Sequence, residues 1–201
     1  MPSIPKPIHD TAAAFDSLPG IGPRASLRYA YWLATQHPES IKKFSQAILS
    51  LADGIKRCAL CGDWTDIAGC KICSDIRRDQ SLICVVASSQ DIRVIEESGV
   101  YKGLYHSLGG LINPIEGRTP DTLRILPLIS RVQNSNSSIQ EIILALDPDT
   151  QGDMTAMYIT KQLTNTGVRV SRLARGLQHG AQIEYADGTT IADALSNRRQ
   201  S

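Results

Sequence analysis

The sequence predicts a multi-part chain with mixed α+β and α/β character: a helical N-terminal module, a small four-cysteine lobe, a parallel α/β sheet, and a short C-terminal strand and helix. Three observations predict it. Apolar residues recur at helical spacing before residue 58, two CxxC pairs follow, and from residue 81 short β-branched runs alternate with amphipathic segments. We therefore expect four parts, at residues 1–57, 58–79, 80–173 and 174–201.

Three helices are predicted in the first part. Ile8, Ala12 and Phe15 follow the i, i+4, i+7 spacing of one helix face. The segment LPGIGP at 18–23 interrupts this pattern, and a second helix follows it. A third amphipathic helix is expected over residues 41–55, after the break at Pro38. A helical module of about 57 residues is marginally stable by itself.

The third part is predicted to alternate strands and helices. Strands are expected at residues 82–87, 103–107, 141–146 and 168–173, and helices at 89–98, 121–132 and 153–164. This alternation indicates a parallel sheet with helices on both faces. Segments 134–138 and 174–180 are expected to be loops, and a short strand at 182–185 and a helix from Thr189 follow.

Composition excludes several classes of protein. The chain has 201 residues, 42% of them hydrophobic and 20% charged, with a net charge of +1, which excludes a disordered polymer. Its apolar runs are far shorter than the roughly 18 residues of a membrane span. Residues 1–10 lack the apolar core of a secretion signal. We therefore expect a cytoplasmic protein without a membrane partner.

Basic charge is concentrated near the two ends of the sequence. Residues 1–57 carry seven Lys or Arg against four Asp or Glu, residues 58–164 nine against thirteen, and residues 165–201 five against three. This balance does not fit a strongly basic, monomeric DNA-binding domain. We expect any nucleic-acid contact to be local and salt-sensitive, or multiplied by oligomerisation.

Four of the five cysteines form a metal-ligand pattern. Cys58 with Cys61, and Cys70 with Cys73, make two CxxC pairs with eight residues between them, a pattern typical of tetrahedral Zn²⁺ sites. Four sulfur ligands leave no position for water, so the site would be structural and metal binding would contribute to folding. Four buried or redox-active thiols are the alternative. Cys84 lies in an apolar run and is expected in the core.

The turn between the first two helices is a candidate nucleic-acid contact. Gly20 and Gly22 would allow a phosphate to approach backbone N–H groups at the start of the second helix. Arg24 and Arg28 are four residues apart, so they share one face of this helix. The pattern resembles the helix-hairpin-helix motif, which binds DNA backbone without reading sequence. An ordinary turn between helices is the alternative.

Three carboxylates follow the strand predicted at 141–146. Asp147, Asp149 and Asp153 would lie at the carboxyl end of a parallel strand, where α/β folds place ligand sites. Clustered carboxylates can hold Mg²⁺ for phosphoryl chemistry. The alternative is that they cap the following helix, and the position of Asp153 suits that role.

Taken in order, these features resemble the RecR family of bacterial recombination mediators. The resemblance covers nearly the whole chain. Its markers are LPGIGPR at 18–24, CKICSDIRRD at 70–79, GLYHSLGG at 103–110, RLARG at 172–176 and EYAD at 184–187.

The resemblance implies a Toprim domain and a non-enzymatic role in recombinational DNA repair. Members of the family act with RecO and RecF to load RecA onto gapped DNA, and they assemble as ring-like homodimers or homotetramers. The family's DNA-contacting basic positions correspond to Arg24 and Arg28. The bound DNA would be single-stranded, double-stranded or gapped, and the Toprim face would receive RecO.

One position departs from the family pattern. Catalytic Toprim domains use a glutamate at the end of the first strand, where this chain has Ala87. Because alanine cannot transfer a proton or bind a metal, we do not expect catalysis. Two other classes remain as alternatives: a metal-dependent Toprim-type nuclease or primase, favoured by the three carboxylates, and a scaffold that binds only proteins, favoured by the low net charge.

Overall fold

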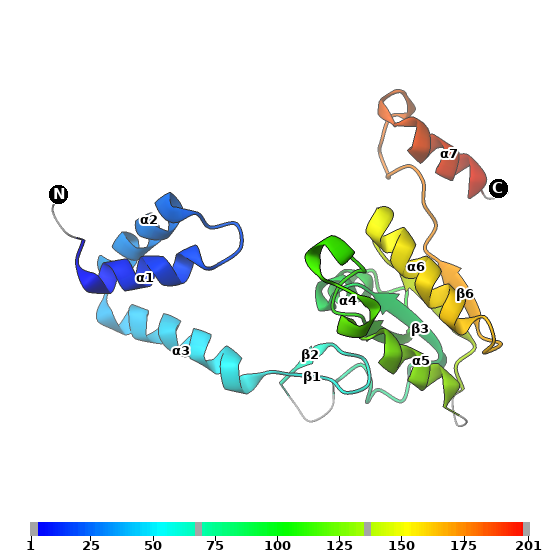
Figure 1. The fold of residues 1–201 in the computed structure, drawn as a ribbon, viewed down its shortest axis with the longest axis horizontal. Coiled ribbons are helices and arrows are strands. Elements are labelled where there is room, and N and C mark those ends of the chain that lie inside the picture. The colour runs from blue at the N-terminus through cyan, green and yellow to red at the C-terminus, as the bar shows by residue number, and fades with distance from the viewer. Residues whose placement is uncertain (1–3, 67–69, 135–137, 199–201) are drawn as a thin grey trace. The chain divides into compact units, whose positions relative to one another are not determined.

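Three helices make up the N-terminal unit, Met1–Ile55, of this computed structural model, which describes residues 4–66, 70–134 and 138–198 (Figure 1). They are α1 (Lys6–Asp16), α2 (Pro23–Ala34) and α3 (Pro38–Gly54). Each has a proline in its first turn, where a missing N–H costs no hydrogen bond. The three predicted helices are therefore confirmed.

The N-terminal unit has little core of its own. The rings of Phe15 on α1 and Tyr29 on α2 meet edge to face, 5.9 Å apart. Among the described residues of this unit, Ser26 and Ala30 alone are buried. Large apolar side chains are exposed on α2 and along α3, including Trp32, Phe44, Ile48, Leu49 and Leu51. The unit therefore leaves most of the large apolar side chains of α2 and α3 accessible.

A four-stranded parallel sheet forms the centre of the second unit, Lys56–Ser201. Its strands are β3 (Asp79–Val86), β4 (Gly103–Ser107), β5 (Glu141–Ala145) and β6 (Arg169–Arg172), in the spatial order β4-β3-β5-β6. All three pairings are parallel. Because β4 and β6 each pair with one neighbour, they are the edge strands. The predicted parallel α/β sheet is confirmed.

Helices cover both faces of this sheet. Ile83, Val85, Ile142 and Leu144 pack with α5 (Ile125–Gln133) and α6 (Thr150–Leu163) on one face. On the other face, alternate β3 residues pack with Ile92 of α4 (Ser89–Glu97). Cys84 belongs to this second cluster and is buried, as predicted. Burial raises the pKa of its thiol to about 12.

Some predicted boundaries shift for local reasons. Helix α5 begins at Ile125 rather than 121, because Pro120–Thr122 forms a separate 3₁₀ turn. Helix α6 begins at Thr150 rather than 153, because Asp149 is its N-cap. Within the predicted loop 134–138, residues 135–137 lie outside the described residues.

Strand β6 and helix α7 (Gly188–Ser196) are the last regular elements of the described chain. The prediction of an additional strand at 182–185 is wrong. Ile183–Tyr185 forms a 3₁₀ turn. Its hydrogen bonds are local, from Tyr185 N–H to the Gln182 carbonyl and from Ala186 N–H to the Ile183 carbonyl. Strand propensity is realised where a neighbouring strand completes a ladder, and this segment pairs with none.

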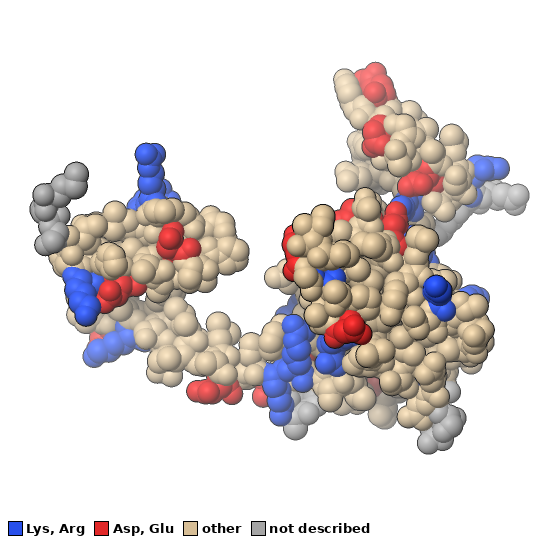
Figure 2. Space-filling view, in the orientation of Figure 1, with Lys and Arg blue, Asp and Glu red and all other residues tan. Residues whose placement is uncertain are grey.

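Charged side chains of both signs are interspersed on the face of each unit shown in Figure 2. No described helix is long and apolar enough to cross a membrane.

Burial of His106 predicts a pH-dependent stability. The ring on β4 is fully buried, its Nε2 lies 2.8 Å from the Arg124 carbonyl, and burial lowers its pKa to about 4. The unfolded chain, with a pKa near 6.5, takes up the proton first, so stability is full above pH 6.5 and falls toward pH 4. Compared with His106→Gln, the unaltered chain should lose about 3 kcal/mol more unfolding free energy over this interval. Equal slopes in denaturant titrations would contradict this.

Candidate metal centre and nucleic-acid hairpin

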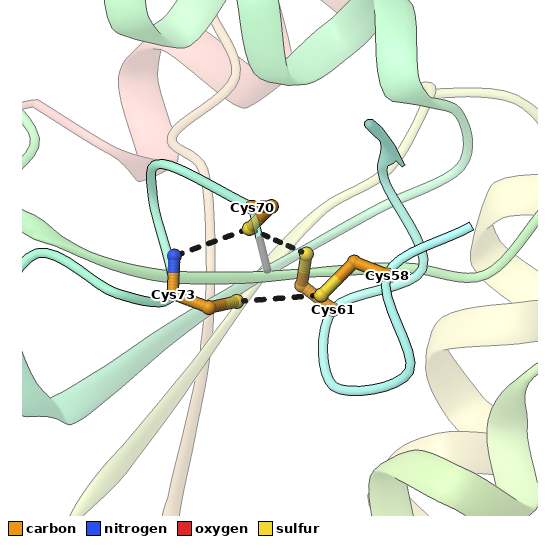
Figure 3. Close-up of side chains that lie close together, drawn as sticks. All are labelled: Cys58, Cys61, Cys70 and Cys73. Carbon is orange, nitrogen blue, oxygen red and sulfur yellow. Dashed lines mark hydrogen bonds between the residues drawn. The ribbon is translucent and has the colours of Figure 1, made fainter. Parts of the chain in front are cut away.

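The four predicted metal ligands meet at one point beside the sheet. Cys58 and Cys61 lie in the loop between β1 (Lys56–Arg57) and β2 (Trp64–Thr65), and Cys70 and Cys73 precede β3. Their sulfur atoms all lie within 4.8 Å of one another. The Cys61–Cys70 and Cys58–Cys73 sulfur distances are 3.6 and 3.9 Å (Figure 3). A tetrahedron with metal–sulfur bonds of about 2.3 Å has edges of roughly 3.8 Å, so the spacing fits a tetrahedral thiolate site.

The protonation chemistry of the cluster also favours a cation. The Cys73 N–H donates to the Cys70 sulfur at 3.1 Å, a contact that stabilises a thiolate. Hydrogen bonding from Cys73 lowers the pKa of Cys61 to about 5, whereas burial raises that of Cys70 to about 11. The negative charge of one thiolate therefore opposes ionisation of the cysteine thiols beside it. A divalent cation would remove this repulsion and hold all four sulfurs ionised.

A tight turn docks the first CxxC loop on the sheet. The Ser107 N–H of β4 donates to the Cys61 carbonyl at 2.7 Å, and Arg124 donates to the Ala59 carbonyl at 3.0 Å. Gly62 has a φ of +76°, and a Cβ there would lie 2.6 Å from the Arg124 Nε and 2.8 Å from the Ser107 carbonyl oxygen. The turn therefore needs glycine both for its backbone conformation and for the close approach to the sheet.

Two arginines complete the outer edge of β4. Arg78 donates to the Gly103 carbonyl and Arg131 to the Tyr105 carbonyl, each at 3.0 Å. Arg78 also forms an ion pair with Glu96 of α4, whose carboxylate accepts the Tyr105 hydroxyl at 2.7 Å. Three backbone groups of this edge that point away from β3, the Gly103 and Tyr105 carbonyls and the Ser107 N–H, are thus met by guanidinium groups and by the cysteine lobe.

The predicted hairpin lies between α1 and α2 in the N-terminal unit. Gly20 has a φ of +80°, and Gly22 is the N-cap of α2. The N–H groups of Ala25 and Ser26 both bond the Gly22 carbonyl, whereas those of Gly22 and Arg24 have no partner among the described residues. These two donors and the positive end of the helix dipole are available to an anion.

Both hairpin arginines are accessible. Arg24 and Arg28 are exposed, and the described part of the chain offers neither of them an ion-pair partner. The Arg28 guanidinium lies 5.2 Å from the centre of the Tyr29 ring. The structure therefore places two unpaired guanidinium groups one helical turn apart, next to two unpaired N–H donors.

The three carboxylates predicted to hold Mg²⁺ do not form a common ligand set. Asp149 accepts the Gly152 N–H at 2.7 Å as the cap of α6. Asp153 is paired with Arg175 and Arg172, which lower the pKa of its carboxyl group. Within the described ranges, the four cysteines are the one group of at least three potential ligands that comes together.

Asp147 and Asp149 nevertheless line an open pocket of about 490 Å³ at the end of the sheet, together with Ala87. A third carboxylate, Asp91, also lines this pocket, but it accepts the Ser88 N–H at 2.7 Å in the capping box of α4, and Ala87 adds no acid. The alternative role considered for Asp153, helix capping, belongs instead to Asp149, four residues earlier. The residues present therefore do not fit a Toprim-type magnesium centre.

Sequence reasoning assigned no role to the arginines that complete these sites. Arg78 and Arg131 meet β4, and Arg172 and Arg175 meet Asp153. Each pairing joins segments far apart in sequence or in different elements. Residue spacing therefore carried no signal for them, although Arg172 and Arg175 lie in the RLARG segment noted above.

Comparison with known proteins supports the architecture. Residues 81–174 match the family model of the Toprim domain, and residues 179–199 match that of the RecR C-terminal region. A protein named Recombination protein RecR from Rhodococcus jostii is 40% identical over 196 residues, covering 96% of this chain and 97% of the relative. Proteins of the same name from Mycobacterium bovis and Mycobacterium tuberculosis are 39% identical over the same length.

The geometry at Gly62 predicts a specific loss of stability. Replacing Gly62 with Ala should lower the unfolding free energy by about 1–3 kcal/mol and reduce the metal retained per chain. Gly188→Ala is the control in the same unit, because its Cβ would meet no atom within 4 Å and its φ is ordinary. Denaturant unfolding and elemental analysis measure both quantities. Equal stability of the two variants would contradict the close approach of Gly62 to β4.

Proposed function

The chain belongs to the RecR family of recombination proteins, and on this premise we propose that it is a DNA-binding mediator of recombinational DNA repair with no catalytic step of its own. In this proposal it acts in the cytoplasm with RecO and RecF, as an oligomeric clamp that helps load RecA onto gapped DNA. The observation that carries DNA binding is the hairpin of the N-terminal unit.

The hairpin is suited to the DNA backbone rather than to bases. Backbone N–H groups at Gly22 and Arg24 can bond phosphate oxygens, and the guanidinium groups of Arg24 and Arg28 add charge beside them. None of these groups selects a base. We therefore propose binding with little sequence preference to single-stranded, double-stranded or gapped DNA, with Gly20 and Gly22 as the contact turn.

The space around Gly22 is open to an external ligand. Its φ of −102° is open to any residue, and a Cβ there would meet no atom within 4 Å. Gly20 differs, because its φ of +80° favours glycine for the turn itself. A side chain at position 22 would therefore leave the fold intact and obstruct only what approaches the helix N-terminus.

We propose that the metal of the cysteine cluster is zinc in a structural role. Four sulfur ligands at tetrahedral spacing suit Zn²⁺ and leave no open position for a substrate. Bound zinc would supply folding free energy rather than a reacting group. Elemental analysis of chain purified without added metal should then report about one zinc per chain; folded protein free of metal would refute it.

The carboxylate edge supports a non-enzymatic role. Asp149 is used as a helix cap, Asp153 is paired with two arginines, and Ala87 provides no acid or base. A Toprim-type nuclease or primase needs those carboxylates for a metal and for proton transfer. Asp147 remains available on this face, where we propose that RecO docks.

Oligomerisation is supported by unburied apolar surface in two places. Helix α3 has no buried residue, and neither does α7. Apolar side chains left in water favour association, and two separate self-associating surfaces allow closed assemblies larger than a dimer. We therefore propose a homodimer or homotetramer, in which several weak hairpins engage one DNA.

DNA binding should depend on the hairpin in a defined way. Arg24→Glu with Arg28→Glu should weaken binding at least tenfold for every sequence. The slope of log affinity against log salt concentration should fall by an amount equal to the release of about two fewer counterions. Gly22→Asn keeps a good helix cap, so it should weaken binding without loss of stability. Lys42→Glu with Lys43→Glu makes the same charge change on α3 and should have a smaller effect. Fluorescence anisotropy over a salt series measures these affinities.

The same complexes test the absence of catalysis. End-labelled gapped DNA, bound as shown by a native gel, should remain intact on a denaturing gel after incubation with Mg²⁺ or Mn²⁺. Cleaved or joined strands would refute the non-enzymatic proposal. Unchanged affinity in the double arginine variant would instead refute the hairpin as the DNA contact.

Self-association should depend on α3. Placing Asp at Ile48 and Leu51, which are 51% and 58% exposed, should shift the mass measured by light scattering toward smaller species. Ile115→Asp changes an apolar residue of the second unit that is even more exposed, at 97%, and should leave the mass unchanged. An unaltered chain that is monomeric throughout the micromolar range would contradict the oligomer.

A further inference from the structure

The two edges of the sheet are treated differently. On β4, the Gly103 and Tyr105 carbonyls and the Ser107 N–H, which point away from β3, all have partners. On β6, the N–H groups of Arg169 and Leu173 point inward and bond β5 or the residue before it. Because backbone direction alternates along a strand, Val170 and Arg172 present their N–H and C=O groups outward.

These outward groups of β6 are open. In the ranges that the structure describes, no donor or acceptor meets the backbone of Val170 or Arg172 on its outer side. Both residues are accessible, with Val170 half-buried and Arg172 exposed. Figure 1 shows β6 at the outer side of the sheet beside α6. The edge thus offers two donors and two acceptors in the spacing of a strand ladder.

Basic side chains flank this edge on both faces of the sheet. Arg169, 74% exposed, pairs with Glu141 on one face. On the other face, Arg172 and Lys161 line an open groove of about 370 Å³ with the exposed Met157 of α6. Asp153 is shared between Arg172 and Arg175, so it does not fully neutralise either. Cations therefore exceed anions along the edge.

We propose that the outer edge of β6 is a docking site for an extended acidic segment of a partner protein, which adds a fifth strand to the sheet. Main-chain hydrogen bonds to Val170 and Arg172 would hold the segment. Its acidic side chains would face Arg169, Arg172 and Lys161, and an apolar side chain would cover Met157. A second copy of β6 fits less well, because it would bring two sets of the same cations to one seam.

The probe for this proposal is a blocked ten-residue peptide in which valine occupies every third position and glutamate the others, so that both faces of the extended strand carry glutamate and valine. It is added to the ¹⁵N-labelled full chain. At saturation, the peptide should slow hydrogen exchange of the Val170 and Arg172 amides at least tenfold. A peptide with lysine in place of glutamate should not. Lys161→Glu with Arg169→Glu should weaken binding at least tenfold, whereas Arg93→Glu, an exposed residue of α4, should leave it unchanged.

A backbone variant tests the ladder separately from the charges. Val170→Pro removes an outward N–H without removing a bond to β5, so it should abolish protection while the sheet persists. If this variant is destabilised, the charge variants still decide. The proposal would be overturned if the acidic peptide left amide exchange unchanged, or if the lysine peptide bound equally well. It would also be overturned if the Val170 and Arg172 amides became protected simply on raising the protein concentration without peptide, or if single-stranded DNA displaced the peptide. All readouts are independent of the hairpin arginines.

Discussion

The hydrogen bond from the Ser107 N–H to the Cys61 carbonyl, with that from Arg124 to the Ala59 carbonyl, joins the cysteine lobe to the parallel sheet, and the covering of the β4 edge depends on this junction. An exposed edge strand is prone to pairing with other chains. Here the lobe covers the end of β4, and Arg78 and Arg131 bond the carbonyls beside it. A metal that holds the four sulfurs would therefore order the lobe and, through it, protect one edge of the sheet.

Arginine side chains have different surroundings in the two units. In the N-terminal hairpin, Arg24 and Arg28 have no acidic partner and are available to phosphate. At the carboxylate edge, Arg172 and Arg175 are instead paired with Asp153. One of the three carboxylates that follow β5 is thus paired with the protein's own guanidinium groups. This pairing supports the proposed role, in which the domain serves docking rather than phosphoryl chemistry.

Exposed apolar surface supports the proposed self-association. The N-terminal unit buries Ser26 and Ala30 but leaves α3 without a buried residue. A small helical unit of this kind gains stability from a partner that covers its apolar face. Self-association would bring several hairpins to one DNA, so that a chain with a net charge of +1 could still bind it usefully.

The sequence by itself determined the features that rest on local spacing. Helical periodicity located α1, α2 and α3, two CxxC pairs identified the cysteine cluster, and alternating β-branched runs identified the parallel sheet. Tertiary structure decided what depends on segments meeting across the fold. It turned the strand expected at 182–185 into a 3₁₀ turn, because no neighbouring strand completed a ladder there. It paired Asp153 with Arg172 at the end of β6 and with Arg175 beyond it, and it bonded outward groups of β4 while leaving those of β6 open. Such pairings are set by the positions of whole elements, and no residue pattern within one segment encodes them.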